Sequence, residues 1–117
     1  MCSREDNIRL HHMLDAAKEA ISFLQGKTRI SLDDNRMLTL FLVKEIEIIG
    51  EAATRISKDC RDKYPHIPWE SIINMRNRLI HAYFDINLDV VWQTVEVDVP
   101  SLIMEFEKIV IEKQDPG

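Results

Sequence analysis

The sequence predicts an all-α protein, and more narrowly an up-and-down four-helix bundle. Apolar residues recur at spacings of three and four along several stretches, which is the period of a helix that buries one face. No stretch shows the strict alternation of a half-buried strand. The 117 residues are 45% hydrophobic and include only three glycines and four prolines. We therefore expect one domain over residues 1–117, with its own core and short connections.

The first helix is expected from about Asp6 to Gln25, because Gly26 is a natural stop after it. Ser31 or Asp33 can cap a second helix that runs to about Lys58. The buried stripe of the first helix consists of Leu10, Leu14, Ala17, Ile21 and Leu24.

The second helix is expected to be the most buried element, because apolar residues cover two of its sides and more than one partner must cover them. Gly50 lies within it and costs about 1 kcal/mol relative to alanine. This placement predicts close packing against another backbone at Gly50. One apolar side consists of Leu38, Leu42, Ile46, Ile49, Ala53 and Ile56, and the other of Met37, Phe41, Ile48 and Ala52.

Three glutamates on this helix, Glu45, Glu47 and Glu51, raise the question of a carboxylate-bridged metal site. No helix carries the Glu-x-x-His pattern of the di-iron bundles, so we expect a solvated or ion-paired face, with Glu51 beside Gly50 as the exception. His11 and Asp15 have the spacing of half a metal site, without a second pair to complete it. The sequence thus predicts no metal and no cofactor.

Two prolines interrupt the helical pattern between residues 60 and 68, which predicts a loop with Tyr64 and His66 at the surface. Pro68 is suited to the first turn of a third helix, over residues 69–84. The expected buried side of that helix consists of Ile72, Ile73, Leu79 and Ile80.

The last helix is expected to start at Asn87 or Asp89. Pro100 should kink it or divide it in two, because proline lacks a backbone donor. The apolar seam alternates spacings of three and four and consists of Leu88, Val91, Val95, Val99, Leu102, Phe106 and Ile109.

Polar chemistry is concentrated in the third helix, where Arg76, Asn77, His81 and Tyr83 lie within eight positions. At about 100° per residue, Arg76 and Tyr83 fall about 20° apart on one face, and Asn77 and His81 lie one turn apart on a neighbouring face. Arginine binds phosphate with a planar fork, and histidine transfers protons near neutral pH. The cluster suits phosphodiester chemistry.

A structural interpretation of the same residues is that Arg76 pairs with a nearby carboxylate, His81 marks a helix end and Tyr83 anchors the core. For Trp69 and Trp92 we favour a place in the core over base stacking.

The net charge and the cysteine content indicate which partners and which cellular compartment to expect. The net charge of −5 does not attract nucleic acid through the overall field, so such a contact must be local. Residues 52–81 carry six basic and three acidic side chains, a local surplus of three positive charges. Cys2 and Cys60 are not expected to pair, which fits a reducing cytosol. No apolar run spans a membrane and the first residues lack a signal-peptide core, so we expect a cytoplasmic protein.

Four blocks of the sequence resemble the HEPN domains, and among them the HepT-like toxins encoded beside a minimal nucleotidyltransferase antitoxin. The central block has the pattern of an arginine, four residues, and then His-x-Tyr, here at Arg76, His81 and Tyr83. The blocks are Ile48-Ile-Gly-Glu-Ala52, Ile67-Pro-Trp69, Arg76-Asn-Arg-Leu-Ile-His-Ala-Tyr83 with Phe84, and Val91-Trp92 with Val99-Pro-Ser-Leu102.

The resemblance implies a metal-independent endoribonuclease, the toxin of a type VII-like toxin–antitoxin pair. It would act as a homodimer, with the two motifs meeting across the interface. Arg76 and His81 would be the catalytic residues, with Asn77 and Arg78 supporting them. The nucleotidyltransferase antitoxin would neutralise the RNA-cleaving toxin by adding AMP to Tyr83.

Two other functions are compatible with the residues. In the first, the chain is a non-catalytic helical module that pairs with a nucleotidyltransferase. In the second, it is a structural or nucleotide-binding helical dimer whose basic region, around Arg55, Lys58, Arg76 and Arg78, holds a nucleotide phosphate.

Overall fold

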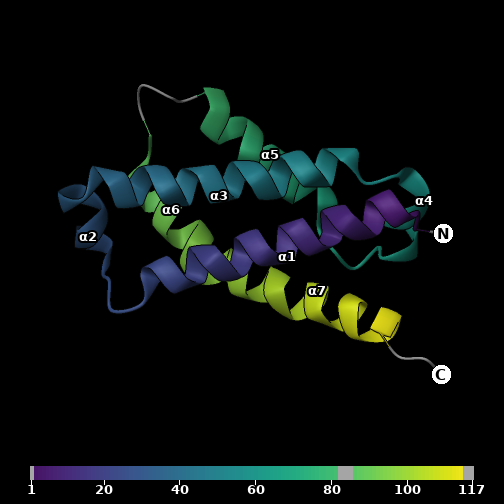
Figure 1. The fold of residues 1–117 in the computed structure, drawn as a ribbon. Helices are drawn as coiled ribbons and strands as arrows, with labels where there is room; N and C mark the ends of the chain where they lie inside the picture. The colour runs from purple at the N-terminus through teal and green to yellow at the C-terminus, as the bar shows by residue number, and fades with distance from the viewer. Residues whose placement is uncertain (1, 82–85, 115–117) are drawn as a thin grey trace.

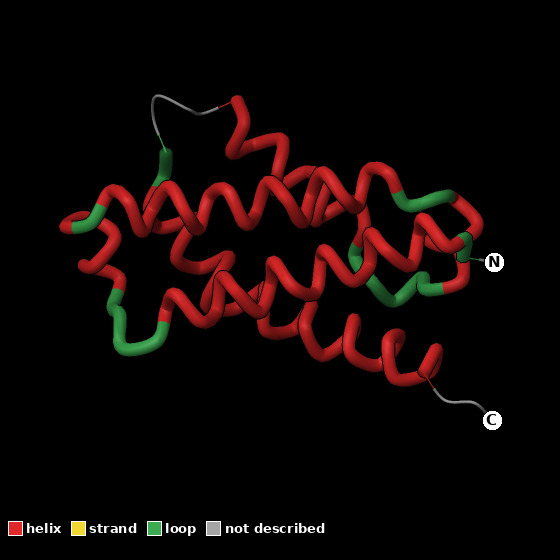
Figure 2. The backbone as a smooth tube through the Cα atoms, in the orientation of Figure 1, coloured by secondary structure: helices red, strands yellow, loops and turns green. Residues whose placement is uncertain are grey.

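Helices account for all the regular structure in a computed structural model, which describes residues 2–81 and 86–114, with the backbone alone for residues 78–81 and 110–114. Figure 2 shows this helical content along the backbone. The elements are α1 (Arg4–Leu24), α2 (Arg29–Asp34), α3 (Arg36–Arg55), α4 (Lys58–Lys63), α5 (Trp69–His81), α6 (Leu88–Gln93), a π-helical turn η1 (Thr94–Asp98) and α7 (Val99–Gln114).

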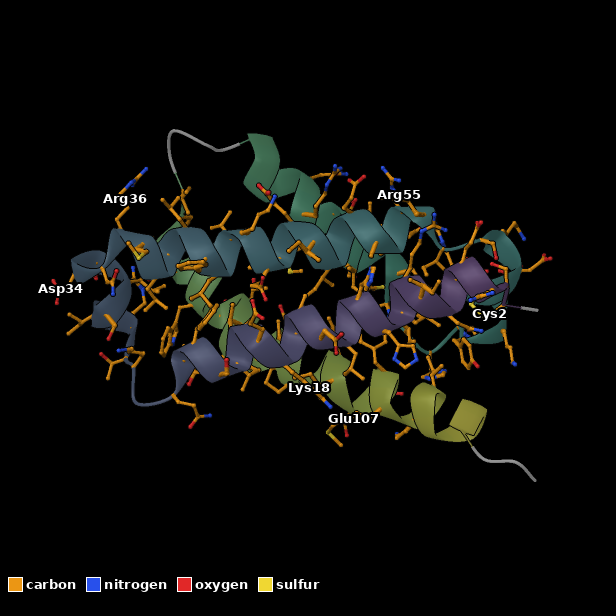
Figure 3. The ribbon with its side chains drawn as sticks, viewed as in Figure 1. Cys2, Lys18, Asp34, Arg36, Arg55 and Glu107 are labelled. Atoms are coloured by element: carbon orange, nitrogen blue, oxygen red, sulfur yellow. A yellow bond between two sulfur atoms is a disulfide. The ribbon has the colours of Figure 1, made fainter. Side chains whose placement is uncertain are left out.

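Four helical arms run alternately up and down: α1, α3, α5, and the arm made by α6, η1 and α7 (Figure 1). This arrangement confirms the predicted bundle. Helix α3 packs against both α1 and α5, and α1 also contacts α7. Lys18 of α1 and Glu107 of α7 form an ion pair of 3.3 Å between these two helices (Figure 3).

The predicted apolar stripes form the core. In α1, Leu10, Leu14 and Ala17 are buried, whereas Ile21 is partly buried. In the last arm, the seam is buried at Val91, Val95, Val99, Leu102, Phe106 and Ile109. None of the helices in the described ranges is long and apolar enough to cross a membrane.

The N-terminal half of α3 leaves apolar surface exposed. The expectation that both apolar sides are covered is wrong at Met37 and Phe41, whose exposed fractions are 69% and 49%. On this side of α3, Ile48 and Ala52 line a space shared with α1. Phe41 packs against Phe23 of α1, with ring centroids 5.4 Å apart, and about half of its surface stays exposed.

The single helix expected from Ser31 or Asp33 to Lys58 is wrong, because the chain breaks at Asn35 into α2 and α3. The Asn35 side chain accepts a hydrogen bond from the Leu38 backbone N–H (3.0 Å) and so caps α3. Thr39 Oγ1 donates to the Leu32 carbonyl (3.0 Å) and ties the two helices together. Local capping thus outweighs the continuous apolar period.

The loop expected over residues 60–68 begins instead with the short helix α4, capped by Ser57. Tyr64 was expected at the surface, and this is wrong, because its exposed fraction is 4%. Its backbone carbonyl accepts a hydrogen bond from Trp69 Nε1 (3.0 Å), so Trp69 lies in the core as predicted. His66 is exposed as expected and contacts Glu105 (Nε2 to Oε2, 3.1 Å).

The last arm is divided near Pro100, as predicted. Asn87 is its N-cap, accepting hydrogen bonds from the Asp89 and Val90 backbone N–H groups. In the π-helical turn, the Val99 N–H donates to the Thr94 carbonyl five residues back. The wider turn changes the hydrogen-bond register just before Pro100, which lacks an N–H and cannot continue the usual pattern.

The two cysteines are paired, and the expectation that they are not is wrong. A Cys2–Cys60 disulfide joins the start of α1 to α4, with the Cα atoms 4.5 Å apart. Next to it, buried Asp6 accepts hydrogen bonds from the Ser57 N–H (2.9 Å), the Ser57 hydroxyl (2.6 Å) and the Ser3 N–H (3.0 Å). Burial raises the pKa of Asp6, but these hydrogen bonds outweigh it and lower the pKa to about 2.

Glu45 was expected on a solvated or ion-paired face, and this is wrong, because its exposed fraction is 5%. Burial, together with the charge of Glu19 and a hydrogen bond to it, raises the pKa of Glu45 to about 7. Glu47, by contrast, lies 3.9 Å from Lys44 Nζ in an ion pair, as expected. The periodic pattern did not show which of these glutamates faces α1.

The raised pKa of Glu45 predicts that the fold loses stability as pH rises. The folded state binds the proton more tightly than the unfolded state, so the stabilisation is complete below about pH 4.5 and is lost as pH rises through about 7. At about 1.4 kcal/mol per pKa unit, the loss approaches about 3 kcal/mol. We expect Glu45→Gln to be more stable than the wild type at pH 8 and to lack this dependence, as measured by urea unfolding from pH 4 to 8. A wild-type free energy of unfolding that rises from pH 5 to pH 8 would contradict the assignment.

Candidate active site

Helix α5 brings the arginine of the polar cluster onto α3. Ile72 and Met75 are buried and fix α5 in the bundle, and Arg76 follows directly after Met75. The side chain of Arg76 has an exposed fraction of 26%, so it lies between the helices rather than in open solvent. Of the expected buried side, Ile72 is buried and Ile73 partly buried, whereas the side chains of Leu79 and Ile80 lie outside the described residues.

Gly50 provides the space that Arg76 occupies. A Cβ atom at position 50 would overlap the Cβ of Arg76 and would lie 2.6 Å from its Cγ. A close approach at Gly50 is therefore confirmed, but the atoms that it meets belong to the Arg76 side chain and not to another backbone. A residue of any other type at position 50 would push Arg76 away from α3.

The guanidinium of Arg76 is held at both terminal nitrogens. Nη2 donates to Glu51 Oε2 (2.7 Å), and Nη1 donates to Asn77 Oδ1 (2.8 Å). The expectation that Arg76 pairs with a nearby carboxylate is thus confirmed. Arg76 Nε is buried and has no hydrogen-bond partner among the described residues. Asn77, expected to support the catalytic residues, contacts the Arg76 guanidinium in this structure.

A groove of about 620 Å³ lies between α1 and α3, and Arg76 of α5 is among the residues that line it. Arg55 projects from its rim at the C-terminal end of α3 (Figure 3). The sequence interpretation did not connect α1 with this site, although Glu5, Ile8 and His12 recur at helical spacing on the side opposite the buried stripe. The lining residues are Glu5, Ile8, Arg9, His12, Lys44, Glu47, Ile48, Glu51, Ala52, Arg55 and Arg76.

The other residues of the predicted site are located only in part. His81 is the last residue of α5, and Arg78 lies in the same helix, but both side chains lie outside the described residues. Tyr83 lies outside them entirely. Within the described ranges, no three His, Cys, Asp or Glu side chains are grouped so that they could bind a metal ion.

Several basic side chains of residues 52–81 form ion pairs or hydrogen bonds within the protein. Lys58 pairs with Asp62 (2.8 Å), and Arg55 pairs with Glu51 (3.2 Å). Arg61 donates to the backbone carbonyls of Ile56 (3.1 Å) and Thr54 (3.2 Å). The surplus therefore does not form one open cationic patch in the described part of the chain.

Comparison with known proteins places the chain in a family. Residues 13–109 match the model of the family described as "Ribonuclease HepT-like". A Thermococcus cleftensis protein named "Probable ribonuclease HepT" is 39% identical over 100 residues, which cover 82% of this chain and 91% of that protein. A Methanocaldococcus jannaschii protein named "Putative RNase MJ1216" is 36% identical over 110 residues, which cover 94% of this chain and 91% of that protein. No solved structure matches the chain significantly. Because the family model spans most of the chain, this protein belongs to the ribonuclease HepT-like family.

Proposed function

We propose that this protein is a metal-independent endoribonuclease and the toxin of a type VII-like toxin–antitoxin pair. The observation that carries the proposal is the guanidinium of Arg76, which is held by Glu51 and Asn77 and lines an open groove. The same helix ends at His81. Membership of the HepT-like family and the ribonuclease names of the relatives support the reaction type.

RNA supplies its own nucleophile, so the protein needs only to move protons and stabilise charge. His81 accepts the proton of the 2′-hydroxyl as its oxygen attacks phosphorus and the bond to the 5′-oxygen breaks. Arg76 stabilises the negative charge that develops on the phosphoryl oxygens. Asn77 holds the guanidinium, and Arg78 supports phosphate binding from the same helix. The products carry a 2′,3′-cyclic phosphate and a 5′-hydroxyl.

The departing 5′-oxygen needs a proton, and one α5 helix offers a single histidine. We propose that the protein is a homodimer in which His81 of a second copy supplies this proton. Exposed apolar side chains on α1 and α3 support a second copy as partner, because Ile8, Leu40 and Phe41 are each more than two-fifths exposed. Mixed dimers with one His81→Ala subunit should therefore cleave at well under half the wild-type rate.

We expect purified wild-type protein to cleave total RNA in the presence of EDTA, and Arg76→Ala and His81→Ala to be slower by about a hundredfold or more. Arg29→Ala is a matched control, because Arg29 is also ion-paired, with Asp33 (3.0 Å) and Asp89 (2.7 Å), but lies on α2 and does not line the groove. Cleavage and end groups are measured by gel electrophoresis and phosphatase sensitivity. Intact RNA with wild-type dimer, together with a stable complex with the nucleotidyltransferase, would instead identify a non-catalytic interaction module.

Tyr83 is proposed as the AMP acceptor of the partner nucleotidyltransferase. An added phosphate and nucleoside would bring negative charge and bulk to the Arg-x4-His-x-Tyr motif and exclude RNA. We expect Tyr83→Phe to cleave RNA at close to the wild-type rate and to escape the antitoxin, as measured by mass spectrometry and cleavage after incubation with the transferase and ATP. Neutralisation of Tyr83→Phe by an active transferase would rule out this role.

A further inference from the structure

Glu51 contacts the arginine to which the proposed function assigns phosphate binding. Its two carboxylate oxygens are divided between two arginines. Oε2 accepts from Arg76 Nη2 at 2.7 Å, and Oε1 accepts from Arg55 Nε at 3.2 Å. We propose that Glu51 is a positioning residue, which fixes the orientation in which the Arg76 guanidinium meets the RNA phosphate. This inference rests on the proposed function.

Two neighbouring residues of α3 act on the two ends of the Arg76 side chain. Gly50 leaves room for the stem, because a Cβ there would overlap the Cβ of Arg76. Glu51 binds the guanidinium itself, and Asn77 binds its other terminal nitrogen at 2.8 Å. A mobile arginine side chain loses rotamer entropy when it is fixed. Here α3 already holds the Arg76 side chain in the folded protein, so this entropy is lost on folding and not on substrate binding.

The charge balance allows Glu51 to hold Arg76 without cancelling its attraction for phosphate. Glu51 carries one negative charge between two arginines, so the three side chains together retain one positive charge. An arginine has five N–H donors, and the contacts to Glu51 and Asn77 use one each on two different nitrogens. Donors on both terminal nitrogens therefore stay available for a bidentate phosphate contact.

A carboxylate in this place could instead compete with the phosphate for Arg76, and the two roles have opposite consequences. If Glu51 competes, removing it frees the arginine, and cleavage becomes faster or the KM for RNA falls. If Glu51 positions Arg76, removing it leaves a mobile guanidinium, and kcat falls with little change in KM. The short contact to Nη2, combined with the contact of Asn77 on Nη1, favours positioning.

The test compares Glu51→Ala and Glu51→Gln with the wild type in cleavage of a mixed-sequence single-stranded RNA carrying a fluorophore and a quencher. We expect Glu51→Ala to lower kcat by tenfold to a hundredfold, on the order of one charge-assisted hydrogen bond, with KM within about threefold. Glutamine keeps an acceptor for Nη2, so Glu51→Gln should recover most of the lost kcat. Asp62→Ala is the matched control, because it also removes an acid from an exposed i,i+4 ion pair but lies on α4 outside the groove.

A second measurement does not depend on activity. Nuclear magnetic resonance of the Arg76 guanidinium should show hindered rotation in the wild type and in Glu51→Gln, and free rotation in Glu51→Ala. Unchanged or faster cleavage by Glu51→Ala, or unchanged hindered rotation, would overturn the positioning role. If the wild type itself leaves RNA intact, the proposed function fails, whereas the rotation measurement still decides whether Glu51 orients Arg76.

Discussion

Gly50→Ala is expected to destabilise the protein and to reduce RNA cleavage by at least tenfold. A glycine-to-alanine change inside a helix usually gains about 1 kcal/mol. Here the new Cβ would overlap the Cβ of Arg76, and forcing extra atoms into a packed contact costs about 1–3 kcal/mol. Relief of the overlap requires α5 to move away from α3, which would separate Arg76 from Glu51. Urea unfolding and RNA cleavage measure the two effects.

A double-mutant cycle tests whether the overlap with Arg76 is the cause. Arg76→Gly removes all three atoms that the new Cβ would meet, so in that background Gly50→Ala should be neutral or stabilising. If Gly50→Ala costs the same free energy of unfolding in both backgrounds, its effect does not come from the contact with Arg76.

Loss of the Cys2–Cys60 disulfide is expected to lower the free energy of unfolding by about 4 kcal/mol. The bond connects residues 58 positions apart, and closing a loop of this length removes much of the entropy of the unfolded chain. Cys2→Ala is the cleaner variant, because Cys60 is fully buried and its replacement would also lose packing. Urea unfolding of the wild type and of Cys2→Ala, with and without dithiothreitol, measures the change.

Cys2→Ala also provides the control for this measurement. Reductant should lower the stability of the wild type and leave the stability of Cys2→Ala unchanged. Two titratable thiols in the unfolded wild type without reductant, together with equal stability of both proteins, would contradict the pairing. The hydrogen bonds from Ser57 to Asp6 join the same two segments, so part of the local structure should survive reduction.

Local sequence signals determined much of the fold. The alternating spacing of the last helix predicted the buried seam from Val91 to Ile109. Asn87 or Asp89 was expected as its cap, and the structure shows Asn87, whose side chain accepts from N–H groups only two and three residues away. Gly50 was recognised as a close contact because glycine is unfavourable inside a helix without such a reason. These signals act within a few turns of one helix, so periodicity and capping chemistry suffice to read them.

The tertiary structure alone decided which residues meet across the bundle. The burial of Glu45 beside Glu19, the pairing of Cys2 with Cys60 and the burial of Tyr64 all depend on segments distant in sequence. In the candidate site, too, the sequence identified a residue and the tertiary structure determined its partner. The sequence by itself selected Arg76 and predicted a carboxylate partner, but only the packing of α5 on α3 assigned that partner to Glu51, because one helix cannot specify which face of another it will meet.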